Sequence, residues 1–132
     1  MQAQKTPFGF MVVLDPGDEL IRSLTALARQ EDIDGAAITG AGRVRELELG
    51  IYDPLAADYH RKSFQDHFEM CALTGSLALF DGEPFPQLHG VFSRTDFSII
   101  GGQIFEAVCA ESIEVAVYTL PTPLIRKLES RA

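Results

Sequence analysis

Only one stretch of this chain has the spacing of an amphipathic helix, and almost everything after it has the pattern of β-strands. In that stretch the apolar residues recur every three or four positions and form one stripe: Leu20, Ile21, Leu24, Leu27 and Ala28. Asp15 and Pro16 match the cap and the first position of a helix, and Asp34-Gly35 matches its end. We therefore predict one principal helix between these signals.

The remaining apolar segments are short, alternate with polar residues and are separated by turn residues. Residues 8–14 predict a buried strand. Residues 44–52 predict a half-buried strand with Leu47, Leu49 and Ile51 on one face. The segment Gly40-Ala41-Gly42 predicts a β-bulge or a tight turn, and Pro84 and Pro86 predict a sheet edge or a loop. Further strands are predicted at residues 36–39, 59–64, 68–80, 87–92, 97–100, 103–108 and 113–120.

Hairpin-length connections between consecutive strands indicate a mainly antiparallel sheet. The predicted class is therefore α+β, with this sheet packed against the principal helix and a short C-terminal helix at residues 124–129. The chain has 132 residues, which suits a single domain, and we place its core at about residues 8–129. The alternation of strands and helices that a dinucleotide-binding fold requires is absent from the pattern.

Composition and charge narrow the possible functions. The hydrophobic fraction is 46% and the charged fraction 23%, as in a soluble globular protein. Nineteen acidic against eleven basic residues give a net charge of −8, which disfavours binding to DNA and to anionic membranes. The first apolar run, residues 8–14, is too short to span a bilayer. We expect a cytoplasmic protein without a membrane partner.

Residues with reactive side chains do not form a known catalytic or metal-binding motif in the sequence. Cys71 and Cys109 lie in apolar stretches, so we expect reduced, buried thiols. His60 and His67 flank a charged stretch and are expected at the surface. The three carboxylates inside strand-like runs are expected on solvent faces, although an inner-face carboxylate would mark a site: Glu69, Glu106 and Glu114.

His89 is the histidine with the most informative surroundings. It alternates with Gln87 on one strand face, and a hairpin could bring Gln103 to the same place. Such a group would form either a binding site or a polar cluster whose members satisfy one another's hydrogen bonds.

Several segments, in this order and spacing, resemble the plants-and-prokaryotes conserved (PPC) domain. The most specific are Gln87-Leu88-His89, Ile100-Gly101-Gly102-Gln103 and Ser112-Ile113-Glu114-Val115. Residues 16–20, 37–42, 49–53 and 73–75, together with Glu69, are similar as well. The resemblance extends over about residues 8–129.

This resemblance implies an α+β domain that assembles as a homotrimer, with a site near the subunit boundaries. In prokaryotic members the motif His-x-His followed by Gly-Gly-His looks like a metal site, with zinc as the expected ion. The matching residues here are Gln87, His89 and Gln103, and neutral amides are poor zinc ligands. We therefore expect no metal or cofactor, and a polar ligand site formed by Gln87, His89, Gly101, Gly102, Gln103 and Glu114.

The resulting hypothesis is a non-enzymatic homotrimeric domain that binds a protein partner or a small polar ligand between subunits. A first alternative is a DNA-associated regulatory protein. The resemblance carries a DNA-binding description, although in plant members an AT-hook outside this domain contacts the DNA. A second alternative is an enzyme of unknown reaction that uses a polar pocket around His89, because a lone histidine can act as a general base near neutral pH.

Overall fold

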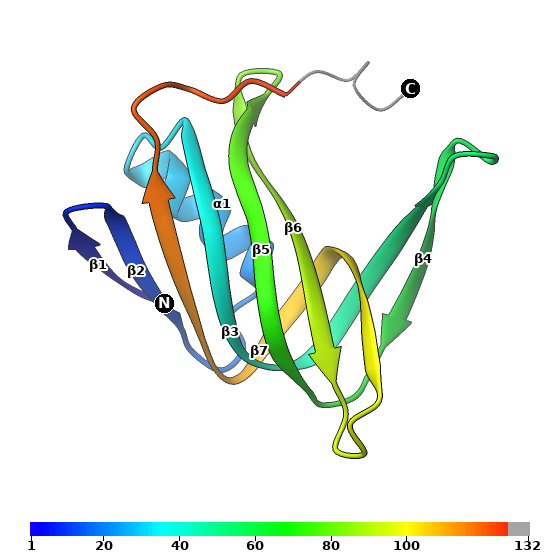
Figure 1. Ribbon diagram of the computed structural model, residues 1–132. Coiled ribbons are helices and arrows are strands. Elements are labelled where there is room, and N and C mark those ends of the chain that lie inside the picture. Colours follow the sequence, from blue (N-terminus) through cyan, green and yellow to red (C-terminus); the bar gives the residue numbers. More distant parts are fainter. Residues whose placement is uncertain (127–132) are drawn as a thin grey trace.

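Seven antiparallel strands form one curled sheet beside one helix in the computed structural model, which describes residues 1–126 (Figure 1). The hydrogen-bonded order is β1-β2-β7-β6-β5-β3-β4, and an additional β7–β3 pairing closes the central strands on themselves. This is the mainly antiparallel sheet with one principal helix that the sequence predicts. The elements are β1 (Gln2–Thr6), β2 (Gly9–Leu14), α1 (Leu20–Gln30), β3 (Gly35–Asp53), β4 (Asp58–Phe64), β5 (Phe68–Phe80), β6 (Glu83–Ser93) and β7 (Ile99–Thr119).

Strands β3 and β7 are much longer than the sequence predicts. The register of β3 against β5 shifts between Gly40 and Gly42, so the predicted β-bulge is present but does not end the strand. Strand β7 likewise joins segments that the sequence divides at its glycine pair and again near residue 110. Each long strand bends and pairs with different neighbours along its length. These bends curl the sheet around the core.

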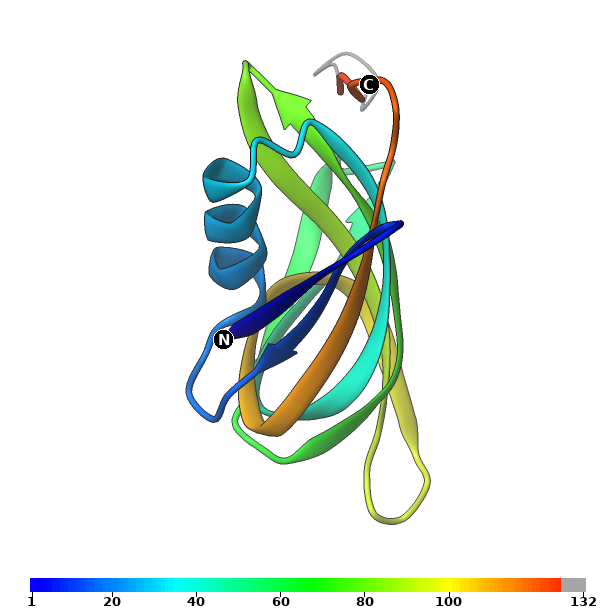
Figure 2. The same cartoon turned by 90° about the vertical axis from the view of Figure 1, so that its left-hand side faces the viewer.

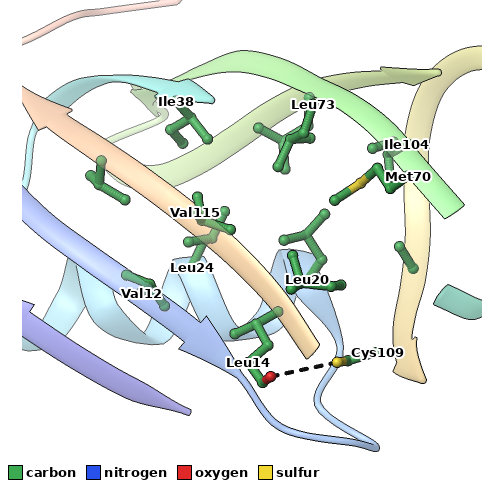
Figure 3. Close-up of a cluster of buried hydrophobic side chains, with 14 of the residues drawn as sticks. Val12, Leu14, Leu20, Leu24, Ile38, Met70, Leu73, Ile104, Cys109 and Val115 are labelled. Carbon is green, nitrogen blue, oxygen red and sulfur yellow. Dashed lines mark hydrogen bonds between the residues drawn. The ribbon is translucent and has the colours of Figure 1, made fainter. Parts of the chain in front are cut away.

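The predicted apolar stripe of α1 packs against the inner side of the sheet (Figure 2). Leu20, Leu24, Leu27 and Ala28 of this stripe are buried, and Ile21 lies at its margin. Figure 3 shows Leu20 and Leu24 facing sheet residues that include Val12, Ile38, Leu73 and Val115. α1 has eleven residues, and no helix within residues 1–126 is long and apolar enough to cross a membrane.

The ends of α1 differ from the prediction. The helix begins after Glu19, whose side chain caps it, whereas Asp15 lies in the preceding turn. Its last residue is Gln30, and Asp32 takes the positive φ of 53° that we expected near Asp34-Gly35. Asp15 and Pro16 satisfy a local capping rule, but a buried hydrogen bond from a distant strand fixes Glu19 as the cap.

Three further predictions are corrected. Strand β1 was not predicted, because its sequence Gln-Ala-Gln-Lys-Thr has no apolar alternation. The C-terminal helix is not shown: Leu124 and Arg126 form backbone hydrogen bonds with Leu79 of β5, and residues 127–129 lie outside the described residues. Cys71 is exposed, because a register shift between β5 and β6 at this position turns it outward. Cys109 is buried as predicted, and burial raises the pKa of its thiol.

The side of the sheet opposite α1 carries two cross-strand rows without any charged residue. Directly opposed residues of an antiparallel sheet share a face, so the register defines these rows. No helix or strand within residues 1–126 covers them (Figure 2). The Arg126 side chain reaches the second row, where its Nη2 donates to Ser76 Oγ at 2.6 Å. We call the two rows the open face: the first row is Met11, Ala116, Thr39, Thr74 and His89, and the second is Gly9, Tyr118, Ala37, Ser76 and Gln87.

Candidate functional site

His89 and Gln103 face each other on adjacent strands beside a small pocket. The register of β6 against β7 pairs them directly, and β7 places Gln103 opposite Gly50 of β3 on its other side. The first row of the open face therefore continues from His89 into the pocket. The pocket has a volume of about 220 Å³ and is lined by Gly50, Ile51, Tyr52, Tyr59, His89, Gly102 and Gln103.

Gln103 is the buried polar residue of this pocket. Its side chain is 7% exposed, and its Oε1 accepts a hydrogen bond of 2.8 Å from the Tyr59 hydroxyl. A buried carboxamide needs such partners, and this bond fixes the position of its oxygen. Tyr59 lies on the β4 side of Gln103 and His89 lies on the β6 side. The pocket thus presents a phenol, a carboxamide and an imidazole.

The two tyrosines of the pocket were not anticipated from the sequence. Tyr52 ends β3 and Tyr59 begins β4, and the register of this hairpin pairs them. Their rings meet edge to face with centroids 5.3 Å apart, and Tyr59 makes a similar contact with Phe105. No local motif marks them, since the bond from Tyr59 to Gln103 joins residues 44 positions apart. The one indication in the sequence was that a tyrosine lies on either side of the Asp53–Asp58 turn, as expected for a cross-strand pair in a hairpin.

Two glycines make room for the pocket. A side chain at Gly50 would bring its Cβ to 2.3 Å from Cε2 of Phe105. A Cβ at Gly102 would lie 2.8 Å from the carbonyl oxygen of Gly50. Both distances are shorter than real contacts allow, so bare backbone at these positions lets β3 and β7 approach and leaves the hollow beside Gln103.

The other predicted site residues lie outside the lining. Gln87 shares the outward face with His89 but is opposite Ser76, one step farther along β6. Gly101 adjoins the pocket and pairs with Val91. Glu114 is exposed in the other half of β7, opposite Val13 and Ala41. Of the six predicted residues, the structure therefore brings His89, Gly102 and Gln103 into one pocket.

The side chains of this pocket do not fit a zinc ion. His89 is the one imidazole in the lining, Gln103 already accepts the Tyr59 hydroxyl, and Gln87 lies outside. Within residues 1–126, no group of three or more His, Cys, Asp or Glu side chains is arranged to hold a metal ion. Structural zinc sites use four nitrogen or sulfur ligands and catalytic ones usually three protein ligands, so the donor set suits hydrogen bonding instead.

Other polar residues singled out in the sequence make surface contacts. His60 Nε2 lies 2.9 Å from Oδ2 of Asp53, in the β3–β4 hairpin. His67 is exposed, Glu69 lies 3.6 Å from Arg43, and Glu106 is half-buried. A larger hollow of about 380 Å³ lies between the β1–β2 hairpin, the end of α1 and residues 119–123. None of the predicted site residues lines it.

Comparisons with known proteins agree with this fold. A family model described as the Plants and Prokaryotes Conserved (PCC) domain matches residues 1–121. A search of curated proteins finds no match. A crystal structure described as a "putative DNA-binding protein" from Ralstonia eutropha is 32% identical, with 98% of this chain and 92% of that chain covered and a TM-score of 0.91.

Two archaeal structures share the fold at lower identity. A plant- and prokaryote-conserved protein from Pyrococcus horikoshii is 23% identical, with 89% of this chain and 82% of that chain covered and a TM-score of 0.82. A metal-containing protein from Archaeoglobus fulgidus is 24% identical, with coverages of 92% and 86% and a TM-score of 0.85. Since the family model covers nearly the whole chain, this protein belongs to the plants and prokaryotes conserved domain family.

Proposed function

We propose that this chain is a non-enzymatic homotrimeric module that binds a small polar ligand or a protein partner at a site beside the contact between copies. The observation that carries the proposal is the open face. Its ten residues include none of Asp, Glu, Lys or Arg, although the whole chain has a net charge of −8. Arg126 reaches this face from the C-terminal segment and donates to Ser76. Charged residues are depleted in the same way from the cores of protein interfaces.

Exposed apolar side chains extend this face toward the pocket. Val91, next to His89 on the same face of β6, is 42% exposed, and Ile51 in the pocket lining is 64% exposed. A soluble monomer rarely exposes a broad uncharged surface, so a second copy of the chain is a suitable cover. Because the first row of the open face ends at His89, a copy packed there would reach the rim of the pocket. The number of three copies follows from the family resemblance.

Sedimentation equilibrium at micromolar concentration tests the assembly. We expect a mass of three chains for the natural protein. Ala37→Arg, on the open face, should shift the distribution toward the monomer, because it buries an unpaired cation in the contact. Ala26→Arg is the matched control, since Ala26 is also an exposed alanine but lies on α1. A monomeric natural protein, or equal behaviour of the two variants, would contradict the proposal.

DNA association is the second candidate, and the description of the Ralstonia relative is the observation that favours it. The net charge of −8 opposes it, because phosphates repel an acidic surface unless cations gather on one face. An electrophoretic shift assay with duplex DNA at low salt tests this candidate. We expect no retardation of the DNA. A retarded band that weakens steeply with added salt would favour DNA association.

A further inference from the structure

We propose that Phe97 of one copy fills the pocket beside His89 of the next copy in the proposed homotrimer. This inference rests on the proposed assembly and adds the residue by which one chain completes the site of its neighbour. It follows from the exposure of Phe97, the apolar surface of the pocket and the kind of contact that a closed ring of three copies requires.

Phe97 is an exposed aromatic residue at the tip of the β6–β7 hairpin, which projects from one end of the sheet (Figure 1). It is 86% exposed, the largest value for an aromatic residue within residues 1–126. Two residues farther along, Ile99 is 57% exposed. Removing a phenyl ring from water is favourable, so this tip gains free energy when it enters a contact.

The turn at this tip holds Phe97 in one conformation. Its φ is 69°, in the left-handed region that a bulky residue rarely adopts. The backbone N–H groups of Arg94 and Phe97 donate to the carbonyl oxygens of Ser98 and Arg94 at 3.0 and 2.9 Å. Asp96 Oδ1 accepts from the backbone N–H and the hydroxyl of Ser98 at 2.9 and 2.6 Å. A ring presented on such a fixed turn loses little conformational freedom on binding.

The pocket beside His89 suits a phenyl ring. Its phenol and carboxamide, from Tyr59 and Gln103, bond each other at 2.8 Å. The surface that the lining leaves accessible is almost wholly apolar, and the pocket volume is about 220 Å³. A cavity of roughly 150 Å³ is enough to hold benzene. A phenyl ring from outside therefore fits the pocket in size and needs no polar partner there.

Phe97 lies too far along its hairpin to enter the pocket of its own chain. The pocket is at the pair His89 and Gln103. Both strands continue for four more residues, to Ser93 and Ile99, before the turn begins. At about 3.3 Å per residue, the turn starts roughly 13 Å beyond the pocket. The ring at the tip is therefore available to another molecule.

A ring of three copies requires two different contact surfaces on every chain. Three-fold symmetry makes each contact heterologous, so the surface that a copy offers differs from the surface that it receives. The open face and the pocket at its end form one surface, and the β6–β7 tip forms a second. When each tip enters the pocket of the next copy, the ring closes with every Phe97 buried. The neighbour's phenyl ring then forms a wall beside His89 that a single chain lacks.

Photo-crosslinking from position 97 tests the contact directly. The photoreactive residue p-azidophenylalanine replaces Phe97 in the full chain, and the sample is irradiated at a concentration at which the natural protein is assembled. We expect products of two and three chains on a denaturing gel. Mass spectrometry should join position 97 to residues 50–52, 59, 89 or 102–103 of another chain.

Ile125 is the control position for this experiment. It is 73% exposed and lies beside Leu79, at the opposite end of β5 from the part that pairs with Ser93. The same photoreactive residue in place of Ile125 should give no product with the residues of the pocket.

Phe97→Ser measures the contribution of the ring to assembly. Because the ring is buried in each contact, its loss should raise the dissociation constant of the trimer at least about tenfold, as measured by sedimentation equilibrium. Ile125→Ser also removes an exposed apolar side chain, and it should leave the dissociation constant unchanged.

The outcomes separate this inference from the proposed function. A trimer that is equally stable with Phe97→Ser overturns the contact but leaves the homotrimer in place. A trimer whose position 97 reacts only within its own chain, or outside the pocket, does the same. A natural protein that stays monomeric overturns both proposals. Crosslinks into the pocket of another chain, together with a weakened Phe97→Ser trimer, support the inference.

Discussion

Glu19 joins the start of the helix to the sheet through one buried carboxylate. The residue is 7% exposed, and its oxygens accept backbone hydrogen bonds from Arg22 at 2.9 Å, Ile21 at 3.1 Å and Ala107 at 3.0 Å. Glu19→Ala should lower the free energy of unfolding by about 3 kcal/mol, because buried N–H groups lose their acceptor. Urea unfolding at one fixed protein concentration measures this loss.

Glu19→Gln is the matched comparison, since it retains one carbonyl oxygen and should lose less than Glu19→Ala. A Glu19→Ala protein that unfolds at the same urea concentration as the natural one would show that water replaces the carboxylate without penalty. The prediction of Asp15 as the helix cap was wrong because it used local residues alone. The decisive bond comes from Ala107, which is 88 positions away.

Asp53 gives the β3–β4 hairpin a defined response to pH. Its Oδ2 contacts His60 at 2.9 Å, and its Oδ1 accepts from the backbone of Leu55 at 2.9 Å and of Ala56 at 3.4 Å. These hydrogen bonds, with that to His60 first, hold the pKa of Asp53 below its ordinary value. Because the pKa of Asp53 is lower in the folded protein than in the unfolded chain, the ionised carboxylate stabilises the fold. This stabilisation is complete at pH values above the unfolded-state pKa and is lost as the pH falls through the folded-state pKa.

We therefore expect the turn to keep its structure at neutral pH and to loosen below about pH 4. NMR titration of the Asp53 carboxyl carbon, with amide exchange at Leu55 and Ala56, measures both parts of this prediction. Asp53→Asn should remove the transition from the exchange profile. An Asp53 that titrates at its ordinary value would contradict the hydrogen-bonding account.

At the scale of elements, the contact of β3 with β7 depends on Gly50. A Cβ added there would lie 2.3 Å from the Phe105 ring, over which the Arg61 guanidinium carbon lies 4.0 Å from the centroid. Gly50→Ala should cost about 2 kcal/mol of unfolding free energy, because the ring must move. The cost should shrink in a Phe105→Leu background, since the clash is with the far end of that side chain.

Unfolding of the natural protein, both single variants and the double variant forms a double-mutant cycle. Strictly additive losses would mean that Gly50 is required for its backbone rather than for the space taken by Phe105. The cycle also bears on the pocket, because both Gly50 and the strand that carries Phe105 border it.

The same elements explain what the sequence could and could not predict. Local patterns identified β2, β4 and β5 nearly to the residue, because each is a continuous run that ends at turn residues. β3 and the first part of β7 were divided at glycines, since a glycine that ends a strand and one that permits close approach look alike in a sequence. β7 was divided again at residues 109–112, where the apolar alternation is interrupted. The proximity of His89 and Gln103 could be predicted, because a single hairpin brings them together. The proximity of Tyr59 to Gln103 could not be predicted, because it depends on the register of β3 with both β4 and β7.

For the whole molecule, the net charge and the open face lead to opposite salt dependences for the two candidate functions. Copies that each carry a charge of −8 repel one another, while the open face between them contributes no charged pair. Raising NaCl from about 0.05 M to about 0.5 M should therefore leave self-association unchanged or strengthen it, because salt screens the repulsion. Binding to DNA would weaken over the same range, since phosphate contacts release counterions.

Sedimentation equilibrium across that salt series, with and without duplex DNA, measures both dependences on one sample. Ala37→Arg should weaken self-association at every salt concentration, and Ala26→Arg should follow the natural protein. Self-association that falls as salt rises would mean that ion pairs, and not the uncharged rows, hold the copies together. The open face would then be free for another partner, and the pocket beside His89 would lie on the surface of one chain rather than at a boundary between chains.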